Sequence, residues 1–160
     1  MAKKRMTHVD DTGAARMVDV SAKDRTERVA VAEGTIRLNR DARTALFSRA
    51  SKKGDAIAVA RVAGIMAAKK TSELIPLCHP LSASSILIDI EEVARPSGAR
   101  VRATIRVTDR TGAEMEALTA VSITLLTIYD MLKSIQEDMI IGDIRLRRKT
   151  GGRSGDINLP

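Results

Sequence analysis

The stretch that decides the fold is Ile86-Leu-Ile-Asp-Ile-Glu91, followed after a turn by Val101-Arg-Ala-Thr-Ile-Arg-Val-Thr108. Apolar residues recur at every second position in both segments, which is typical of strands with one face toward a core and one toward water. The connection Arg95-Pro-Ser-Gly98 carries turn-forming residues. The two segments therefore predict a pair of antiparallel strands joined by a short turn.

The residues after this pair predict the longest helix, from about 113 to 136. Its apolar residues recur at helical spacing on one side; they are Leu118, Val121, Leu125, Ile128, Leu132 and Ile135. No charged residue occurs between Ala117 and Tyr129, so the opposite side of the helix also lacks strongly polar groups. A helix of this kind is commonly buried on more than one side, and we expect a second subunit to cover it.

Shorter elements complete the predicted fold. They are one bent strand or two short strands over 29–38, a helix over 40–50 capped by Asn39, a helix over 56–68 capped by Asp55, and a strand over 140–146. A helix that lies on an antiparallel sheet indicates an α+β sandwich. Residues 1–28 are polar and show no sustained period, which favours a mobile arm.

Length and charge limit the possible functions. The chain has 160 residues, the usual size of one domain, and 27 Lys and Arg against 20 Asp and Glu give a net charge of +7. This charge favours an anionic partner. Phe47 and Tyr129 are the only aromatic residues, whereas proteins that hold single-stranded nucleic acid usually supply aromatic platforms. We therefore expect a phosphorylated small molecule and no nucleic acid; a basic nucleic-acid-binding module is the alternative.

The single cysteine and the hydropathy pattern bear on location. Cys78 cannot form an internal disulfide or half of a Cys-x-x-Cys metal site, which favours a reducing compartment. No apolar run follows Lys3-Lys-Arg5, and the most apolar window, 56–68, is too short to span a bilayer. We expect a cytoplasmic protein without a membrane partner. No His, Cys, Asp and Glu cluster has metal-ligand spacing, so no metal site is predicted, although a phosphohydrolase would need one.

Two neighbouring residues form the first candidate site. His79 lies in a segment that Pro76 and Pro80 make stiff and non-helical. Its ring can serve as an acid, a base or a phosphate contact, or it can have no role. Cys78 has no neighbour that obviously lowers its pKa, so we interpret it as a small packing residue rather than a nucleophile.

Asp130 and Lys133 stand three residues apart on the long helix and can touch. They form either an ordinary ion pair or a functional pair. They are the first charges after thirteen uncharged residues, at the edge of a face that we expect to be covered. A lysine in such a place can have a lowered pKa and transfer protons.

Further charges can contact a phosphorylated ligand. Glu114 and Glu116 fall in the first helical turn, where carboxylates stabilise the helix, and they point about 160° apart, so at most one should face a pocket. The basic residues are each explicable as solvated charge, but together they can surround a triphosphate; they include Lys52, Lys53, Lys69, Lys70, Arg145, Arg147, Arg148, Lys149 and Arg153. The glycine-rich segment 151–155 lacks the spacing of a P-loop.

Several motifs occur together in a fixed order. They are Met17-Val-Asp-Val-Ser-Ala-Lys23, Lys53-Gly-Asp55, Ala63-Gly-Ile65 with Ala67-Ala-Lys69, Leu74-Ile-Pro-Leu-Cys-His-Pro-Leu81, Gly112-Ala-Glu-Met-Glu-Ala-Leu-Thr-Ala120, Leu126-Thr-Ile-Tyr-Asp-Met131 and Lys149-Thr-Gly-Gly-Arg-Ser-Gly155. This set resembles the molybdenum cofactor biosynthesis protein C family, the cyclic pyranopterin monophosphate synthases. The resemblance implies one domain at 17–156, between an arm at 1–16 and a tail at 157–160.

The resemblance also implies an architecture and a reaction. The subunit would be a ferredoxin-like α+β sandwich with helices on one face of the sheet, assembled as a hexamer, a trimer of dimers, with active sites at subunit interfaces. The enzyme would be a lyase that rearranges 3',8-cyclo-7,8-dihydroguanosine 5'-triphosphate to cyclic pyranopterin monophosphate and releases pyrophosphate. A radical-SAM GTP 3',8-cyclase would supply the substrate. No cofactor is implied, although Mg²⁺ can accompany the triphosphate.

The resemblance assigns roles to individual residues. The catalytic residues that it implies are Asp130, Lys53, Lys133 and His79. The substrate-contacting residues that it implies are Leu77, Cys78, His79, Met115 and Glu116, with Glu114, Lys69, Lys149 and Arg28 as further polar residues of the pocket.

Overall fold

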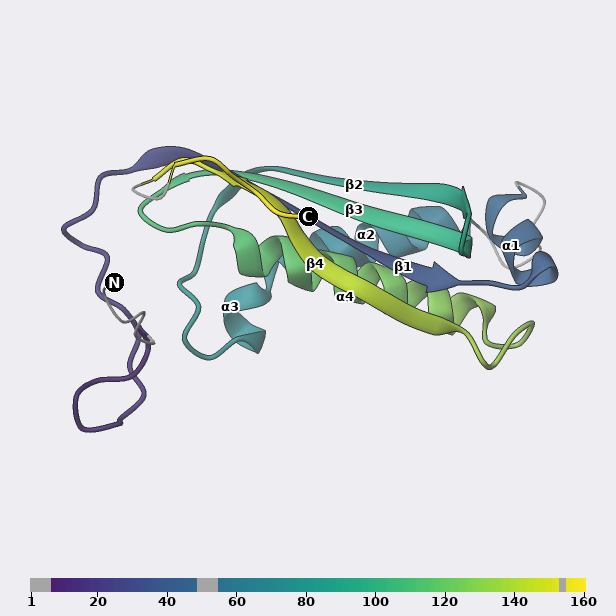
Figure 1. Ribbon diagram of the computed structural model, residues 1–160, viewed down its shortest axis with the longest axis horizontal. Helices are drawn as coiled ribbons and strands as arrows, with labels where there is room; N and C mark the ends of the chain where they lie inside the picture. Colours follow the sequence, from purple (N-terminus) through teal and green to yellow (C-terminus); the bar gives the residue numbers. More distant parts are fainter. Residues whose placement is uncertain (1–6, 49–54, 153–154) are drawn as a thin grey trace.

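The structure is a computed structural model that describes residues 7–48, 55–152 and 155–160. Its elements are, in chain order, β1 (Thr26–Arg37), α1 (Arg40–Phe47), α2 (Ala56–Lys69), α3 (Thr71–Leu74), β2 (Ala83–Ala94), β3 (Ser97–Asp109), α4 (Glu114–Leu132), β4 (Ile140–Thr150) and β5 (Ile157–Asn158). The strands form one antiparallel sheet in the order β2-β3-β1-β4-β5. Helices α2 and α4 cover one face of this sheet, which confirms the predicted α+β fold (Figure 1).

The strand pair at the centre of the prediction is confirmed. Strands β2 and β3 are antiparallel neighbours whose pairing runs through to Ala94 opposite Ser97. The alternate residues Val101, Ala103 and Ile105 of β3 are fully buried. Arg102, which lies between two of them, leaves the core, and its side chain is 44% exposed. The alternation in the sequence therefore separates a helix-covered face from an open face.

The main core helix is shorter than predicted. Helix α4 ends at Leu132 rather than near Gln136, and Ile135 is 45% exposed. Beyond Leu132 the chain turns, with the N–H of Ile135 donating to the carbonyl of Leu132 at 2.8 Å, and returns toward β4. The apolar pattern of the sequence therefore runs about one turn beyond the end of the helix.

Helix α4 also has the length and composition of a membrane span. Half of its most apolar stretch is buried inside the fold. Val121, Leu125 and Ile128 are fully buried. Packing within the fold therefore accounts for part of the apolar character of this helix.

The predicted caps are confirmed, and several bounds are corrected. The side chains of Asn39 and Asp55 accept N–H hydrogen bonds at the starts of α1 and α2, each at 2.9 Å. Residues 29–37 belong to one strand, which begins at Thr26 inside the predicted arm and ends one residue before the predicted bound. Helix α1 ends at Phe47 rather than at residue 50. Strand β4 continues to Thr150, beyond the predicted end at residue 146, because its basic second half pairs with β1 and β5. That half has no apolar pattern that could predict a strand.

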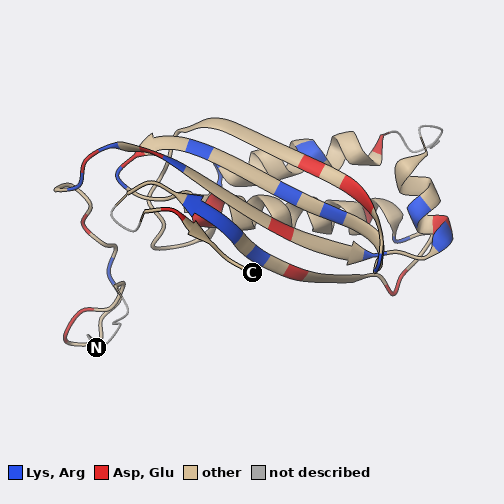
Figure 2. Ribbon diagram, turned by 45° about the horizontal axis from the view of Figure 1, so that its top comes forward, with Lys and Arg blue, Asp and Glu red and all other residues tan. Residues whose placement is uncertain are grey.

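The open face of the sheet carries a row of opposite charges. Across the strands Asp89 lies opposite Arg102, Arg102 opposite Glu33, and Glu33 opposite Arg145. The Glu33 side chain is only 10% exposed, and its carboxylate lies 3.3 to 3.5 Å from Arg102, Arg145 and Arg147. Figure 2 shows acidic and basic positions along the strands of this face. The acidic side chain at the centre is thus enclosed by cations.

Candidate functional site

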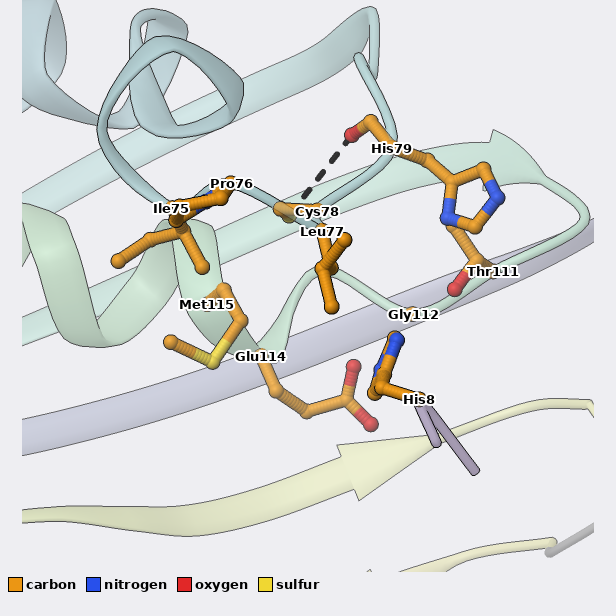
Figure 3. A pocket seen from close by; sticks show the side chains of 10 residues that line it. All are labelled: His8, Ile75, Pro76, Leu77, Cys78, His79, Thr111, Gly112, Glu114 and Met115. Carbon is orange, nitrogen blue, oxygen red and sulfur yellow. Dashed lines mark hydrogen bonds between the residues drawn. The ribbon is translucent and has the colours of Figure 1, made fainter. Parts of the chain in front are cut away.

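A cavity of about 620 Å³ lies beside the start of α4. Three segments build it: the loop after α3, the residues that lead from β3 into α4, and the N-terminal segment. The lining residues are His8, Ile75, Pro76, Leu77, Cys78, His79, Thr111, Gly112, Glu114 and Met115. Figure 3 shows these side chains, with Leu77 from the loop and Glu114 and Met115 from α4 bordering the same space.

The 76–80 loop is non-helical, as predicted, and follows α3 directly. The N–H of Cys78 donates to the carbonyl of Ile75 at 3.0 Å and closes a turn. Pro76 and Pro80 restrict the backbone on both sides of this turn. The loop therefore presents Leu77, Cys78 and His79 at the cavity in a restricted conformation.

The His79 ring contacts the N-terminal segment. Its Nε2 lies 2.8 Å from the carbonyl oxygen of Val18. Because a carbonyl only accepts, Nε2 carries the proton, and Nδ1 of the neutral ring is left as an acceptor. His8, from the same N-terminal segment, also lines the cavity. These contacts place the segment next to the 76–80 loop.

Cys78, which lines the cavity, contacts Glu116, which does not. The thiol donates to Oε1 of Glu116 over a distance of 3.6 Å. Burial raises the pKa of Cys78 to about 11, with the Glu116 carboxyl as a smaller cause. Burial also raises the pKa of Glu116. The thiol therefore stays protonated near neutral pH, which agrees with the interpretation of Cys78 as a packing residue rather than a nucleophile.

Glu114 faces the cavity and pairs with Lys149 near the end of β4. Its Oε1 lies 3.0 Å from Nζ of Lys149, and both side chains are about 30% exposed. Glu116 is only 4% exposed and does not line the cavity. The expectation that at most one of these two carboxylates faces a pocket is therefore confirmed.

Arg28 lies next to this pair, beside the glycine-rich segment. Its Nε donates to the carbonyl of Asp109 at 3.0 Å and its Nη2 to the carbonyl of Arg110 at 3.1 Å. Gly152 has a φ of +71°, which favours glycine, and a Cβ there would lie 2.2 Å from Nη1 of Arg28. A small hollow of about 30 Å³ separates Arg28 from Glu114 and Lys149. Cationic groups and backbone N–H groups thus gather at one place.

Asp130 and Lys133 form the predicted contact at the other end of α4. Nζ of Lys133 donates to Oδ1 of Asp130 at 2.7 Å, and the side chains of Lys133 and Asp130 are 62% and 69% exposed. The hydrogen bond and the charge of Asp130 raise the pKa of Lys133. The expectation of a lowered lysine pKa is therefore wrong for this chain, because the partner carboxylate stabilises the ammonium and burial is minor.

A second hollow, of about 430 Å³, adjoins this pair and is lined by Tyr129, Lys133, Ser134 and Glu137. The Tyr129 hydroxyl donates a short hydrogen bond to the backbone carbonyl of Glu137. The hollow thus lies where the chain leaves α4 and turns toward β4.

The structure separates the sequence-predicted residues into two groups. One group gathers at the start of α4; it comprises Arg28, Leu77, Cys78, His79, Glu114, Met115, Glu116 and Lys149. Asp130 and Lys133 form the other group. Lys69 ends α2, is exposed and does not line the cavity. Lys53 and Arg153 lie outside the described residues.

Sequence reasoning did not find several residues that line the cavity. They are His8, Ile75, Thr111 and Gly112. Each belongs to a segment whose local pattern carries no sign of the others, so only the packed chain reveals them. Among residues 7–48, 55–152 and 155–160, no group of three or more His, Cys, Asp or Glu side chains could hold a metal ion.

Comparison with known proteins decides the family. A model of the MoaC family matches residues 17–152. The chain belongs to the MoaC family. The MoaC match includes both groups of site residues and leaves out only His8 among the residues that line the large cavity.

The relatives match over nearly their whole length. A protein of Clostridium botulinum is 57% identical over 97% of this chain and 98% of its own. A protein of Brucella ovis is 55% identical over 95% of this chain and 92% of its own. A protein of Parvibaculum lavamentivorans is 53% identical over 98% of each chain. All three carry the name cyclic pyranopterin monophosphate synthase.

Proposed function

We propose that the chain is a cyclic pyranopterin monophosphate synthase of molybdenum cofactor biosynthesis. It converts 3',8-cyclo-7,8-dihydroguanosine 5'-triphosphate to cyclic pyranopterin monophosphate and releases pyrophosphate, so it is a lyase. The observation that carries the proposal is the large cavity, where the 76–80 loop meets the start of α4 in a chain of the MoaC family. Leu77 and Met115 supply the apolar wall against which the ring system of the substrate packs.

The triphosphate contacts the cationic corner of this site. Lys149 is held by Glu114 at 3.0 Å, and Arg28 is held by two backbone carbonyls, so both cations are positioned before the substrate arrives. Positioned cations and N–H groups neutralise the charge that develops on a leaving pyrophosphate. Lys69 and Lys53 add positive charge in this proposal.

We assign proton transfer to His79 and to the pair of Asp130 and Lys133. The bond from Nε2 of His79 to Val18 leaves Nδ1 able to accept a proton. Lys133 is an ammonium near neutral pH, since Asp130 raises its pKa, and it acts as a proton donor or stabilises negative charge. Lys53 is the second catalytic lysine that we propose.

A second copy of the chain completes the site. The two groups of residues lie toward opposite ends of α4, so residues of both groups can meet one substrate only across an interface. The helix layer offers a surface for this contact, because Val59, Val62, Met66 and Leu126 are each about half exposed. We assign the assembly to a hexamer built as a trimer of dimers.

The remaining parts of the proposal concern the surroundings of the enzyme. A radical-SAM GTP 3',8-cyclase supplies the substrate, and the enzyme works in the cytoplasm without a nucleic-acid or membrane partner. It needs no resident cofactor, while Mg²⁺ can accompany the triphosphate. Activity after treatment with a chelator, with and without added Mg²⁺, measures that requirement.

The direct test is incubation of the purified protein with the cyclised GTP intermediate, with mass detection of the products. Formation of cyclic pyranopterin monophosphate and pyrophosphate in equal amounts is the expected result. The variant that tests the site is Lys149→Ala, which should raise KM at least tenfold with little change in melting temperature. Intact intermediate after prolonged incubation with folded wild-type protein would contradict the proposed function.

A further inference from the structure

His8 lines the large cavity, although it lies outside the stretch that matches the MoaC family. The chain has two histidines, His8 and His79, and both line this one cavity from segments far apart in the sequence. The His8 side chain is exposed, and its ring has no hydrogen-bond or ion-pair partner among the described residues. Both ring nitrogens are therefore available to a ligand in the cavity.

The backbone around His8 forms a small hairpin over residues 8–16, the N-terminal hairpin. The carbonyl oxygen of His8 accepts a hydrogen bond from the N–H of Arg16 at 2.9 Å. Between them, Val9 pairs with Ala15 in an antiparallel bridge. The backbone of His8 is therefore held by hydrogen bonds, although it lies close to the start of the chain.

One side chain closes the tip of the N-terminal hairpin. Oδ1 of Asp10 accepts from the N–H of Thr12 at 2.8 Å and from the N–H of Ala14 at 3.0 Å. The Thr12 hydroxyl donates to the same oxygen at 2.6 Å. Gly13 has a φ of +88°, a conformation that glycine adopts readily. The turn therefore depends on the Asp10 carboxylate, which a single substitution can remove.

The chain is fixed again just after the N-terminal hairpin, against the 76–80 loop. The carbonyl oxygen of Val18 accepts the hydrogen bond from Nε2 of His79 at 2.8 Å. Val18 follows the last residue of the hairpin by only two positions, so the hairpin cannot move far from this loop. It is thereby tied to one wall of the cavity that His8 lines.

The cavity of His8 adjoins the cationic corner of the site. Gly112 and Glu114 line both the large cavity and the small hollow beside Arg28 and Lys149. In Figure 3 the His8 ring is drawn next to the carboxyl group of Glu114. His8 therefore borders the part of the cavity where the hollow of Arg28 and Lys149 begins.

We propose that His8 is a further substrate-binding residue, whose ring donates a hydrogen bond to the triphosphate of the substrate. An imidazole N–H donates to a phosphate oxygen in both the neutral and the protonated form, and such bonds to charged acceptors are stronger than neutral ones. The position of the triphosphate in this corner rests on the proposed function. The N-terminal hairpin holds His8 at the phosphates, while Leu77 and Met115 face the ring system.

Two probes separate the phosphates of the substrate from its ring system. Titration calorimetry of the whole chain measures Kd for sodium tripolyphosphate and, separately, for guanosine. His8→Ala should raise Kd for tripolyphosphate about tenfold or more and leave Kd for guanosine within about twofold. His8→Gln keeps an N–H donor and should restore most of the lost affinity. Thr7→Ala is the matched control, because Thr7 is an exposed neighbour that does not line the cavity.

Asp10→Ala tests whether the N-terminal hairpin positions His8. Loss of the turn should raise Kd for tripolyphosphate to a similar extent as His8→Ala. The double variant should be little worse than either single one, because both changes remove the same contact. The hairpin belongs neither to the sheet nor to the hydrophobic core, so each variant should keep the melting temperature of the wild type.

Turnover of the cyclised GTP intermediate supplies the second measurement. His8→Ala should raise KM about tenfold, with kcat within about twofold of the wild type, because the contact is made to a bound phosphate. A lower kcat with an unchanged KM would place His8 in the chemical step and overturn the proposal.

The binding results exclude the alternatives. Wild-type affinity of His8→Ala for tripolyphosphate overturns the proposal, and so does a wild-type protein that does not bind tripolyphosphate. A loss of affinity confined to guanosine places His8 against the ring system and overturns it as well. If His8 is needed for tripolyphosphate binding but the wild-type protein forms no product, the proposed function fails while the phosphate contact stands.

Discussion

Glu114 and Asp130 lie sixteen residues apart on the same helix, α4, which separates their Cα atoms by about 24 Å. Each belongs to its own hollow, one of about 620 Å³ and one of about 430 Å³ that adjoins Lys133. A site that uses both carboxylates must therefore combine the start of α4 from one copy with the end of α4 from another. This geometry leads to the first prediction.

Two inactive variants should restore each other when they assemble together. Glu114→Ala removes the cavity carboxylate and Asp130→Asn removes the distant one. When the two proteins are dissociated, mixed and reassembled, half of the dimers are mixed and one site in each contains both native groups, so about a quarter of wild-type activity should return. Product formation measures it. No recovery in oligomers that native mass spectrometry shows to be mixed would place the whole site within one copy.

Asp130→Asn should separate stability from turnover. The ion pair with Lys133 is exposed, so its loss should leave the melting temperature and the oligomer almost unchanged. Turnover should fall about 100-fold or more if the pair takes part in proton transfer. Asp138→Asn is the matched control, because Asp138 is exposed and accepts a hydrogen bond from the nearby Gln136. Wild-type product formation by folded Asp130→Asn would refute the catalytic role.

The titration of Lys133 should depend on Asp130. Its folded pKa is raised by the hydrogen bond and the charge of Asp130, so the ammonium form is favoured and the benefit is lost as the pH rises through that pKa. In Asp130→Asn the pKa should fall toward the ordinary lysine value. Carbon-detected NMR of labelled lysine side chains follows this change. An unchanged titration would show that the pair does not form in solution.

The sequence predicted an element well where the pattern that indicates it lies within the element itself. Asn39 and Asp55 were found because a cap bonds only to its own helix, and the pair of β2 and β3 was found because both strands alternate. The end of α4 was placed too far along, since Ile135 continues the apolar spacing beyond the packed helix. Helix α3 and strand β5 carry too few residues to show a period.

The site divides in the same way. The contact between Asp130 and Lys133 followed from helical spacing alone. The contact of Glu116 with Cys78 joins residues 38 apart, and that of His79 with Val18 joins residues 61 apart. Contacts of this kind depend on how the segments pack, which no single window of sequence contains. The sequence pattern therefore predicts neither contact, and the resemblance assigns a role to some of these residues without pairing them.

Gly64 should be sensitive to a single added methyl group. It lies where α2 meets α4, and a Cβ there would stand 2.1 Å from Oγ1 of Thr124 and 3.2 Å from the carbonyl oxygen of Ala120. Alanine favours a helix by about 1 kcal/mol over glycine, yet overpacking typically costs about 1–3 kcal/mol, and a contact this short lies at the upper end. Gly64→Ala should therefore lower the free energy of unfolding in urea.

Two further variants test the cause of that loss. Thr124→Ala in the Gly64→Ala background removes the nearest atom and should recover part of the stability. Gly142→Ala should have little effect, because nothing lies within 4 Å of its added Cβ. Equal stability of Gly64→Ala and the wild type would mean that α2 and α4 pack less closely than the structure shows.

Glu33 should contribute more to stability than an exposed acid on the same strand. Glu33→Gln leaves Arg102, Arg145 and Arg147 close together without their shared carboxylate, and should cost about 2 kcal/mol or more. Glu27 pairs with Arg106 in water, and Glu27→Gln should change stability by less than about 0.5 kcal/mol. Urea unfolding of both variants makes the comparison. Equal effects would contradict the central role of Glu33.

The row of charges on the open face also bears on how the chain avoids misfolding. A strand β3 aligned one residue out of step would turn Arg102 toward the helices, and the core would reject it. A register shift of two residues keeps every apolar side chain on its own face of the sheet, so hydrophobic burial changes little. In one direction such a shift would set Glu33 against Thr104 instead of Arg102, whereas in the other direction it would set Glu33 against Arg100. The charges therefore disfavour one of the two shifts that hydrophobic burial alone leaves equally allowed.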